Sequence, residues 1–342
     1  MPKGVEHSTS GRREPVNLTA TPAALQRQLS PELYLGVDGG GTKTHAVIVD
    51  RQNRIVGEGT SGPSNPLRVG VSPAAAAVRE AVDRACAAAG VRRGDVLALG
   101  VGLAGVRRAD LSERMREALH ALQLDPAEIV TDADIALFGA TNGAPGLVVI
   151  AGTGSICCGR NARGRVAYAG GWGPIVGDEG GGSWIARRGL RAVAHAADGR
   201  GPETALSLAA CEYFNVSTPG DLATAIYAPN MTNERLAGFG RHVVEAAQQH
   251  DAEARDILKA AGVELGLAAG AVVRQLRMER EKFQVAYVGG IFHAGEFILG
   301  SLREAVTRVA AGASFGPPQL VPAVAAAYMA RAHRQRRVAL AG

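Results

Sequence analysis

The chain has 342 residues, of which 46% are hydrophobic and 20% are charged, and its formal net charge is +5. This length and composition are typical of a globular protein of two domains that can bury a substantial core. The best candidate for a membrane span, at 97–106, is interrupted by glycines. It falls short of the roughly 18 apolar residues that a spanning helix needs, so we expect no membrane partner.

The excess positive charge lies at the two ends of the sequence. Residues 1–31 contribute a net charge of +2. Four arginines near the C-terminus contribute +4, namely Arg331, Arg334, Arg336 and Arg337, so the net charge of 32–330 is close to zero. We therefore expect solvated basic residues and no nucleic-acid partner. Residues 1–31 are polar, contain prolines and lack the apolar core of a secretory signal, which predicts a disordered extension. Residues 331–342 are predicted to form a basic tail.

The cysteines do not indicate a metal site. Cys86, Cys157, Cys158 and Cys211 include no CxxC pair, so structural zinc and iron–sulfur clusters both lack the expected ligand spacing. We expect four free thiols in a cytoplasmic enzyme.

The most informative segment is 33–50, which reads LYLGVDGGGTKTHAVIVD. Two apolar stretches this close in sequence predict a β-hairpin. Its turn contains Gly39, Gly40, Gly41, Thr42, Lys43 and Thr44. Glycine backbone N–H groups approach a ligand closely and the threonine hydroxyls add donors, so the turn is suited to hold phosphate. Asp38 stands where a carboxylate could hold Mg²⁺, directly or through water.

A triple-glycine hairpin can also be no more than a turn, and both interpretations stay open at this point. Two other glycine motifs fit poorly. The Walker pattern GxxxxGK[ST] and the dinucleotide pattern GxGxxG both open a helix, whereas here a strand follows and neither spacing occurs.

An α/β layer is predicted for the first half of the chain. A third strand at 54–58 and a loop at 61–66 precede a helix at 72–90, a strand at 96–103, a helix at 109–122 and a strand at 128–131. Three strands able to pair in antiparallel fashion, followed by alternating helix and strand, form such a layer.

The same pattern then starts again. A strand at 146–151 leads into a turn of Gly152, Thr153, Gly154 and Ser155, and we expect the returning strand at 163–169. Thr153 and Ser155 then take the places of Thr42 and Thr44. From 183 the chain is predicted to be mainly helical, with helices at 184–196, 204–214, 218–226, 233–249 and 252–279. A late strand at 284–288 precedes Gly289 and Gly290, a pair that by itself could equally be a helix entry.

Carboxylates mark two further places. Asp132 ends a strand at the edge where open α/β sheets bind ligands, so it is placed to accept a proton. Alternatively it caps a helix at 135–141, a role that Asp134 could fill as well. Asp178 and Glu179 lie in a glycine-rich loop, where carboxylates suit hydrogen bonds to vicinal hydroxyls, or less readily a metal pair.

Four segments, LGVDGGGTKT, IAGTGS, GGWGPIVGDEGGGSWIA and VGGIF, follow one another between 33 and 330. In this order they resemble the N-acetylglucosamine kinase group of the BadF/BadG/BcrA/BcrD-type ATPase family. The resemblance implies an α/β fold of duplicated ribonuclease-H-like domains, the actin-like ATPase fold of sugar kinases and chaperone ATPases, with the nucleotide in the interdomain cleft. We expect domains at 32–145 and at 146–330, the second with a helical insertion.

The resemblance also implies roles for single residues. ATP is expected on the two turns and on Gly289 and Gly290, with Mg²⁺ at Asp38 and Asp132 as catalytic base. The amino sugar is expected to meet Asn65, Asp178, Glu179 and the backbone around Gly182. Trp172 either packs on the apolar face of the sugar or belongs to the core. A homodimer is expected by the same resemblance.

Three positions depart from the group's pattern: Ile156, Gly181 and Ala325. The first stands where a polar residue can meet the sugar and the second where serine is common, which leaves the acetamido preference open. A methyl group on residue 325, where glycine is usual, is expected to crowd the approach to the nucleotide slightly.

The function implied is an ATP-dependent kinase that phosphorylates an amino sugar, at the 6-hydroxyl of N-acetylglucosamine or glucosamine. The alternative is the family's other branch, ATPases that energise a partner enzyme through an iron–sulfur cluster, for which Cys157 and Cys158 do not have the required arrangement. A sensor that controls gene expression lacks room for a DNA-binding motif before 33, and the cysteine-rich signature of the related ROK kinases is absent.

Overall fold

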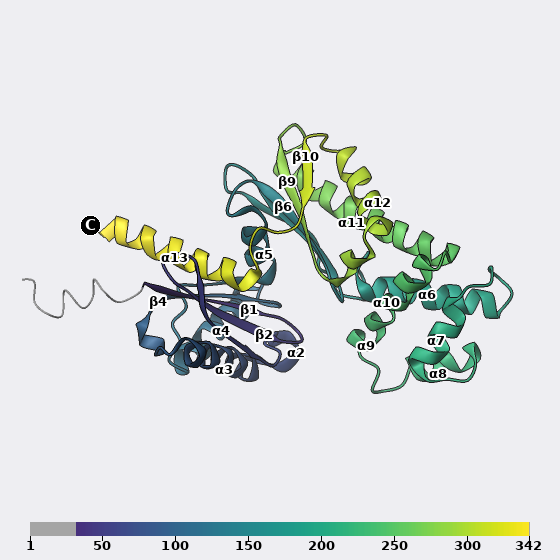
Figure 1. Ribbon diagram of the computed structural model, residues 1–342, viewed down its shortest axis with the longest axis horizontal. Coiled ribbons are helices and arrows are strands. Elements are labelled where there is room, and N and C mark those ends of the chain that lie inside the picture. The colour runs from purple at the N-terminus through teal and green to yellow at the C-terminus, as the bar shows by residue number, and fades with distance from the viewer. Residues whose placement is uncertain (1–31, 342) are drawn as a thin grey trace, which may run out of the picture. The chain divides into compact units, whose positions relative to one another are not determined.

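The computed structural model describes residues 32–341 and contains two mixed five-stranded sheets (Figure 1). The predicted extension at 1–31 lies outside the described residues. Among residues 32–341, no helix combines the length and the apolar character needed to cross a membrane. All four cysteines are free thiols, as expected.

The first sheet has the strand order β3-β2-β1-β4-β5. Its strands are β1 (Leu33–Gly39), β2 (Thr44–Val49), β3 (Ile55–Ser61), β4 (Val96–Leu103) and β5 (Glu128–Thr131). The predicted hairpin is confirmed: β1 pairs with β2 in antiparallel fashion, with Asp38 opposite His45 and Gly39 opposite Thr44. The strands β4 and β5 run parallel to β1, so their carboxyl ends meet at the edge that carries the glycine turn.

The second sheet has the order β10-β9-β6-β7-β8, which repeats the plan of the first. Its strands are β6 (Gly146–Ala151), β7 (Ser155–Arg160), β8 (Val166–Gly170), β9 (Phe283–Val288) and β10 (Ala313–Gly316). The sequence prediction was wrong about the returning strand. The strand that pairs with β6 is β7, and the segment predicted at 163–169 forms β8, the third strand. Cys157 and Cys158 are the fully buried apolar side chains of β7.

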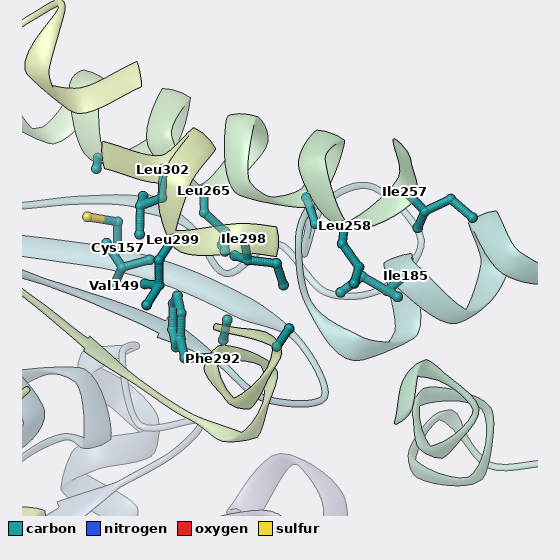
Figure 2. Close-up of a cluster of buried hydrophobic side chains, with 14 of the residues drawn as sticks. Val149, Cys157, Ile185, Ile257, Leu258, Leu265, Phe292, Ile298, Leu299 and Leu302 are labelled. Atoms are coloured by element: carbon teal, nitrogen blue, oxygen red, sulfur yellow. The ribbon is translucent and has the colours of Figure 1, made fainter. Parts of the chain in front are cut away.

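Helices cover both faces of each sheet. On the first sheet, α3 (Val71–Ala89) and α4 (Ala109–Ala121) cover one face and α13 (Pro322–Ala341) the other. On the second sheet, α5 (Asp132–Thr141) covers one face, and α11 (Ala252–Leu276) with α12 (Glu296–Thr307) belongs to the larger core on the other. Figure 2 shows that core, in which Leu265 and Leu302 lie above Val149 and Phe292.

The helical insertion after β8 was predicted in outline. It consists of α6 (Gly182–Ala197), α7 (Leu206–Phe214), α8 (Leu222–Ile226), α9 (Asn233–Gly238) and α10 (Gly240–Gln248). The helix predicted at 233–249 is divided at Phe239, whose fully buried ring packs among aromatic neighbours. The sequence analysis did not include α12 or β10.

The last helix of each half packs on the sheet of the other half. Helix α5 follows β5 but lies on the second sheet, and α13 ends the second half but lies on the first sheet. Glycines make the contact close: a Cβ atom on Gly36 of β1 would lie 2.0 Å from the Ala323 carbonyl oxygen, and one on Gly100 of β4 would lie 2.3 Å from that of Ala326. The α13 backbone therefore rests directly on β1 and β4.

We expect Gly36→Ala to lower the free energy of unfolding by about 2 to 3 kcal/mol, because the added methyl group would force α13 away from β1. Urea denaturation followed by circular dichroism measures this change. The matched control is Gly94→Ala, since a Cβ atom there meets nothing within 4 Å. Equal stability of the two variants would contradict the close packing of α13.

Candidate functional site

The first glycine turn is closed by its own backbone. The Gly40 N–H donates to the Lys43 carbonyl oxygen over 2.9 Å. Thr44 is fully buried, and its Oγ1 lies 2.7 Å from both the Gly62 carbonyl oxygen and Ser64 Oγ. This hydroxyl therefore supports the turn from inside the lobe, whereas Thr42 and Lys43 are exposed at its outer side.

The loop after β3 is tied to the same turn. The backbone N–H groups of Ser64 and Asn65 both donate to the Gly40 carbonyl oxygen, over 3.0 and 3.1 Å. Asn65 caps the short helix α2 (Pro66–Val69), with its Oδ1 accepting the Leu67 N–H over 3.0 Å. A Cβ atom on Gly105 would lie 2.4 Å from this oxygen. The predicted sugar ligand Asn65 is thus held beside the turn, and its side-chain amide nitrogen is the donor that could meet a ligand.

Asp38 and Asp132 lie close together at the carboxyl ends of β1 and β5. Burial raises the pKa of Asp38 to about 6, the charge of Asp132 adds to this rise, and His45 and Lys43 oppose it. Burial likewise raises the pKa of Asp132, although the Ala133 N–H donates to its Oδ1 over 3.0 Å and opposes the rise. Two desolvated carboxylates beside a glycine turn suit proton transfer and cation binding.

Asp134 is engaged elsewhere. Helix α5 begins at Asp132 and is capped by Thr131, and Asp134 completes the capping box by accepting the Thr131 N–H over 3.0 Å. The Tyr168 hydroxyl also donates to Asp134. The alternative prediction, that Asp132 caps the helix, is therefore wrong, because Thr131 is the N-cap. The pattern Thr-x-x-Asp at 131–134 is a sequence signal for this cap.

The second glycine turn repeats the arrangement of the first. The Gly152 N–H donates to the Gly154 carbonyl oxygen over 2.9 Å. The buried Ser155 donates its hydroxyl to the Glu179 carbonyl oxygen over 2.7 Å, whereas Thr153 stays half-buried. The Gly182 N–H, which was predicted to lie beside the sugar, donates to the Gly152 carbonyl oxygen over 2.8 Å. Gly182 therefore ties the start of α6 to this turn.

The glycine pair after β9 lies against the second turn. Gly289 has φ +120°, and a Cβ atom on it would lie 2.2 Å from the Ala151 carbonyl oxygen. Gly290 is exposed and opens a short 3₁₀ helix, Gly290–Ala294. The structure thus brings Gly289, Gly290 and the 152–155 turn together.

Asp178 is packed directly on the second turn. A Cβ atom on Gly154 would lie 2.3 Å from Asp178 Oδ2. Burial raises the pKa of Asp178, while the backbone N–H groups of Ser155 and Gly173 donate to it and oppose the rise. Gly181 has the same close neighbour, since a Cβ atom there would lie 2.7 Å from the Gly154 carbonyl carbon. The absence of a serine at 181 is therefore explained by packing.

The loop between Gly171 and Glu179 presents apolar side chains to solvent. Trp172 is 75% exposed, Ile175 95% and Val176 72%, so the core reading of Trp172 is wrong. A cavity of about 290 Å³ lies beside this tryptophan, and its lining includes Ser155, Ile156, Glu179 and Glu264. Among the described residues, no three His, Cys, Asp or Glu side chains gather as a metal site, so Asp178 and Glu179 lack a third ligand of that kind.

Ala325 does not face an open site. It is fully buried, and a Cβ atom on Gly139 of α5 would lie 3.2 Å from its methyl group. The methyl group therefore fills the contact between α13 and α5, contrary to the expectation that it crowds the nucleotide.

Three residues of this region were absent from the sequence analysis. Ser64 supports Thr44, Tyr168 holds Asp134, and Arg68 of α2 lies against the first turn, with its Nη1 3.0 Å from where a Cβ atom on Gly41 would be. An Asn followed by Pro at 65–66 is a helix-start signal that predicts α2, but the contacts made by these three side chains depend on tertiary structure.

Comparison with known proteins gives consistent results. The model of the BadF/BadG/BcrA/BcrD ATPase family matches residues 35–330. The chain is 32% identical over 271 residues to the N-acetylmuramic acid/N-acetylglucosamine kinase of Clostridium acetobutylicum, covering 79% of this chain and 89% of the relative. It is 32% identical over 280 residues to the N-acetyl-D-glucosamine kinase of Dictyostelium discoideum, covering 77% and 86%. A solved structure from Chromobacterium violaceum is similar with a TM-score of 0.73 and 26% identity, covering 88% of this chain and 99% of that one.

We expect Asp38→Asn to stabilise the ligand-free protein at pH 8 by about 2 to 3 kcal/mol, at about 1.4 kcal/mol per pKa unit. The folded protein keeps Asp38 protonated up to a pH of about 6, whereas in the unfolded chain the side chain has the ordinary aspartate pKa of 3.8. Stability therefore falls as pH rises through this window, and the asparagine removes that loss.

Urea denaturation in the presence of EDTA, at pH 8 and at pH 3.5, measures this effect. The gain is expected at pH 8 and nearly absent at pH 3.5, where Asp38 is protonated in the folded protein and mostly protonated in the unfolded chain. Asp256→Asn, at an exposed position of α11, is the control. A gain of equal size at both pH values would contradict the raised pKa of Asp38.

Proposed function

Because the chain belongs to the BadF/BadG/BcrA/BcrD ATPase family, we propose that it is an ATP-dependent kinase of an amino sugar. The reaction transfers the γ-phosphate to a sugar hydroxyl, the 6-hydroxyl of N-acetylglucosamine or glucosamine. The observation that carries this proposal is that Asp132, at the end of β5, has a desolvated carboxylate. Thr131 caps the helix, so Asp132 is available to accept a proton. The two curated relatives, each about one third identical, are kinases of N-acetylated amino sugars by name.

Asp132 acts as the general base in this proposal. The sugar oxygen forms a bond to the γ-phosphorus, the bond between that phosphorus and the bridging oxygen breaks, and ADP leaves. The hydroxyl proton passes to an oxygen of Asp132. A raised pKa makes a carboxylate a stronger proton acceptor, and Asp134 cannot substitute while it holds Thr131 and Tyr168.

The nucleotide is assigned to the two turns and the glycine pair. Backbone N–H groups, with the outward side chains of Thr42, Lys43 and Thr153, face the phosphates, and Gly289 and Gly290 face the adenosine. Phosphoryl transfer depends mainly on such positioning and on charge stabilisation. Thr44 and Ser155 act from inside, because their hydroxyl groups are bonded to the protein.

Mg²⁺ fits the residues around Asp38. Mg²⁺ is commonly held by one or two carboxylates together with substrate phosphates, and Asp38 is a desolvated carboxylate whose pKa is raised partly by Asp132. Asp38 would hold the ion directly or through water. When bound, the ion would neutralise phosphate charge.

The sugar is assigned to the loops that flank these turns. Asn65 offers its amide, Asp178 and Glu179 offer carboxylates, and the exposed ring of Trp172 offers an apolar face. The position of Asp178 on Gly154 supports a sugar that lies close to the second turn. The homodimer and the cytoplasmic location remain predictions.

The alternative, an ATPase that energises a partner through an iron–sulfur cluster, is disfavoured by the cysteines. Cys157 and Cys158 are fully buried in β7 and belong to the cores on the two opposite faces of the second sheet. Burial raises the pKa of both thiols. Side chains that point apart into two cores cannot ligate one cluster at a surface.

The deciding experiment measures ADP release from MgATP by the purified protein in the presence of N-acetylglucosamine, glucosamine, N-acetylmannosamine, N-acetylmuramate or glucose. We expect strong stimulation by an amino sugar, and loss of that activity by about 10² to 10⁴-fold in Asp132→Asn, the range for a general base. Slow hydrolysis that no sugar stimulates would contradict the kinase.

Asp134→Asn is the matched variant at the same helix start. It weakens the capping box and the bond to Tyr168, so we expect a stability loss of about 1 kcal/mol and activity within tenfold of the wild type. Thermal denaturation and the same ADP assay measure both effects. If Asp134→Asn lost as much activity as Asp132→Asn, the assignment of the base would be wrong.

A further inference from the structure

Arg68 places a positive charge against the first glycine turn. A Cβ atom on Gly41 would lie 3.0 Å from Arg68 Nη1 and 3.3 Å from its Cζ, so the guanidinium covers the outer side of Gly41. The side chain remains 41% exposed. The Arg68 guanidinium therefore lies next to the backbone N–H groups of the first turn, which are assigned to the phosphates.

The position of Arg68 is coupled to the turn by backbone hydrogen bonds. Its N–H donates to the Asn65 carbonyl oxygen over 3.0 Å, and the Asn65 N–H donates to the Gly40 carbonyl oxygen over 3.1 Å. The N–H of Ser64 donates to the same oxygen. The four-residue helix that carries Arg68 is therefore bound to the residue before Gly41, and only the arginine side chain needs to move to change its partner.

The present partner of this guanidinium is Glu234, the second residue of α9, with which it forms an exposed ion pair. Helix α9 packs on α6, and a Cβ atom on Gly182 would lie 3.4 Å from the Ala237 carbonyl oxygen. Gly182 in turn donates to the second turn. The ion pair thus connects the first turn to the helix that backs the second.

We propose that Arg68 is a further catalytic residue, which leaves Glu234 when ATP binds and contacts the terminal phosphates. This inference rests on the proposed kinase function. The planar guanidinium offers paired N–H donors that match phosphate oxygens, and these bonds are stronger than bonds between neutral groups. During transfer, Arg68 stabilises charge on the γ-phosphoryl group and exchanges no proton or electron pair with it.

An ion pair that only fastened two helices would behave differently. Exposed ion pairs contribute little to stability, and the loss of either partner breaks the pair equally. Arg68→Ala and Glu234→Gln should then change AMPPNP binding to the same extent. A phosphate contact makes the two variants differ, because Arg68→Ala removes the contact whereas Glu234→Gln only releases the arginine.

Calorimetry with the purified full chain distinguishes a phosphate contact from a merely structural ion pair by ligand binding alone, with no phosphoryl transfer. The probes are the non-hydrolysable analogue AMPPNP with Mg²⁺, and adenosine. We expect Arg68→Ala to weaken AMPPNP binding by about tenfold or more and to leave adenosine binding unchanged, since one charge-assisted contact is lost. Arg68→Lys should recover part of the loss, and Glu234→Gln should bind AMPPNP at least as tightly as the wild type.

Equal weakening by Arg68→Ala and Glu234→Gln, or unchanged AMPPNP binding by Arg68→Ala, would overturn the proposal. Thermal denaturation of each variant checks that it folds, and unchanged adenosine binding provides a second check.

Steady-state kinetics distinguish a phosphate contact from a contact with an acidic sugar. We expect Arg68→Ala to lower kcat by about tenfold or more with both N-acetylglucosamine and N-acetylmuramate. A rise in KM confined to N-acetylmuramate would assign Arg68 to the sugar carboxylate and overturn the proposal. If the wild type phosphorylates no sugar, the proposed function fails, while the AMPPNP measurement still decides the role of Arg68.

Discussion

The direct contact of α13 with the first sheet is the constraint on which the rest of the structure depends. Gly36 of β1 admits the Ala323 carbonyl oxygen where a side chain would otherwise stand, and Asp38 follows two residues later on the same strand. The same helix packs on α5 through Ala325 and Gly139, and α5 begins at Asp132. The distance between these carboxylates is therefore set by how closely the helices and strands approach, which is why small residues gather there.

In both glycine turns, one in each half, the two hydroxyl residues have the same two roles. In each, the later hydroxyl residue is buried and bonded to a loop that approaches from elsewhere, Thr44 with Gly62 and Ser155 with Glu179. The earlier residue, Thr42 or Thr153, stays accessible. A turn that must present backbone N–H groups to a ligand needs its own backbone held still, and the inward hydroxyl provides that support.

The sequence predicted the elements that depend on local pattern. Apolar strands next to glycine turns indicated the first hairpin and the first strand of the second, and the repeat indicated the duplicated sheet. The returning strand β7 was missed because its Cys157 and Cys158 do not read as strand residues until their burial is known. Arg68 was missed for another reason: its ion-pair partner Glu234 is 166 residues away, and its contact with Gly41 arises only when α2 folds onto the turn. Local pattern thus predicts the groups that a fold presents, whereas tertiary packing decides which of them face each other.

The electrostatics of the first turn connect its stability to its proposed chemistry. Burial and the charge of Asp132 raise the pKa of Asp38, and burial together with the charge of Asp134 raises the pKa of Asp132. This arrangement opposes folding at neutral pH, and a bound cation would relieve it. The nearby cations Lys43 and Arg68 are exposed at the outer side of the turn, where they do not neutralise the two carboxylates fully. A ligand that brings a divalent cation to the two carboxylates and phosphate groups to Lys43 and Arg68 would compensate the charges of both groups at once. This separation of charge supports the proposal that the site binds a nucleotide together with a divalent cation.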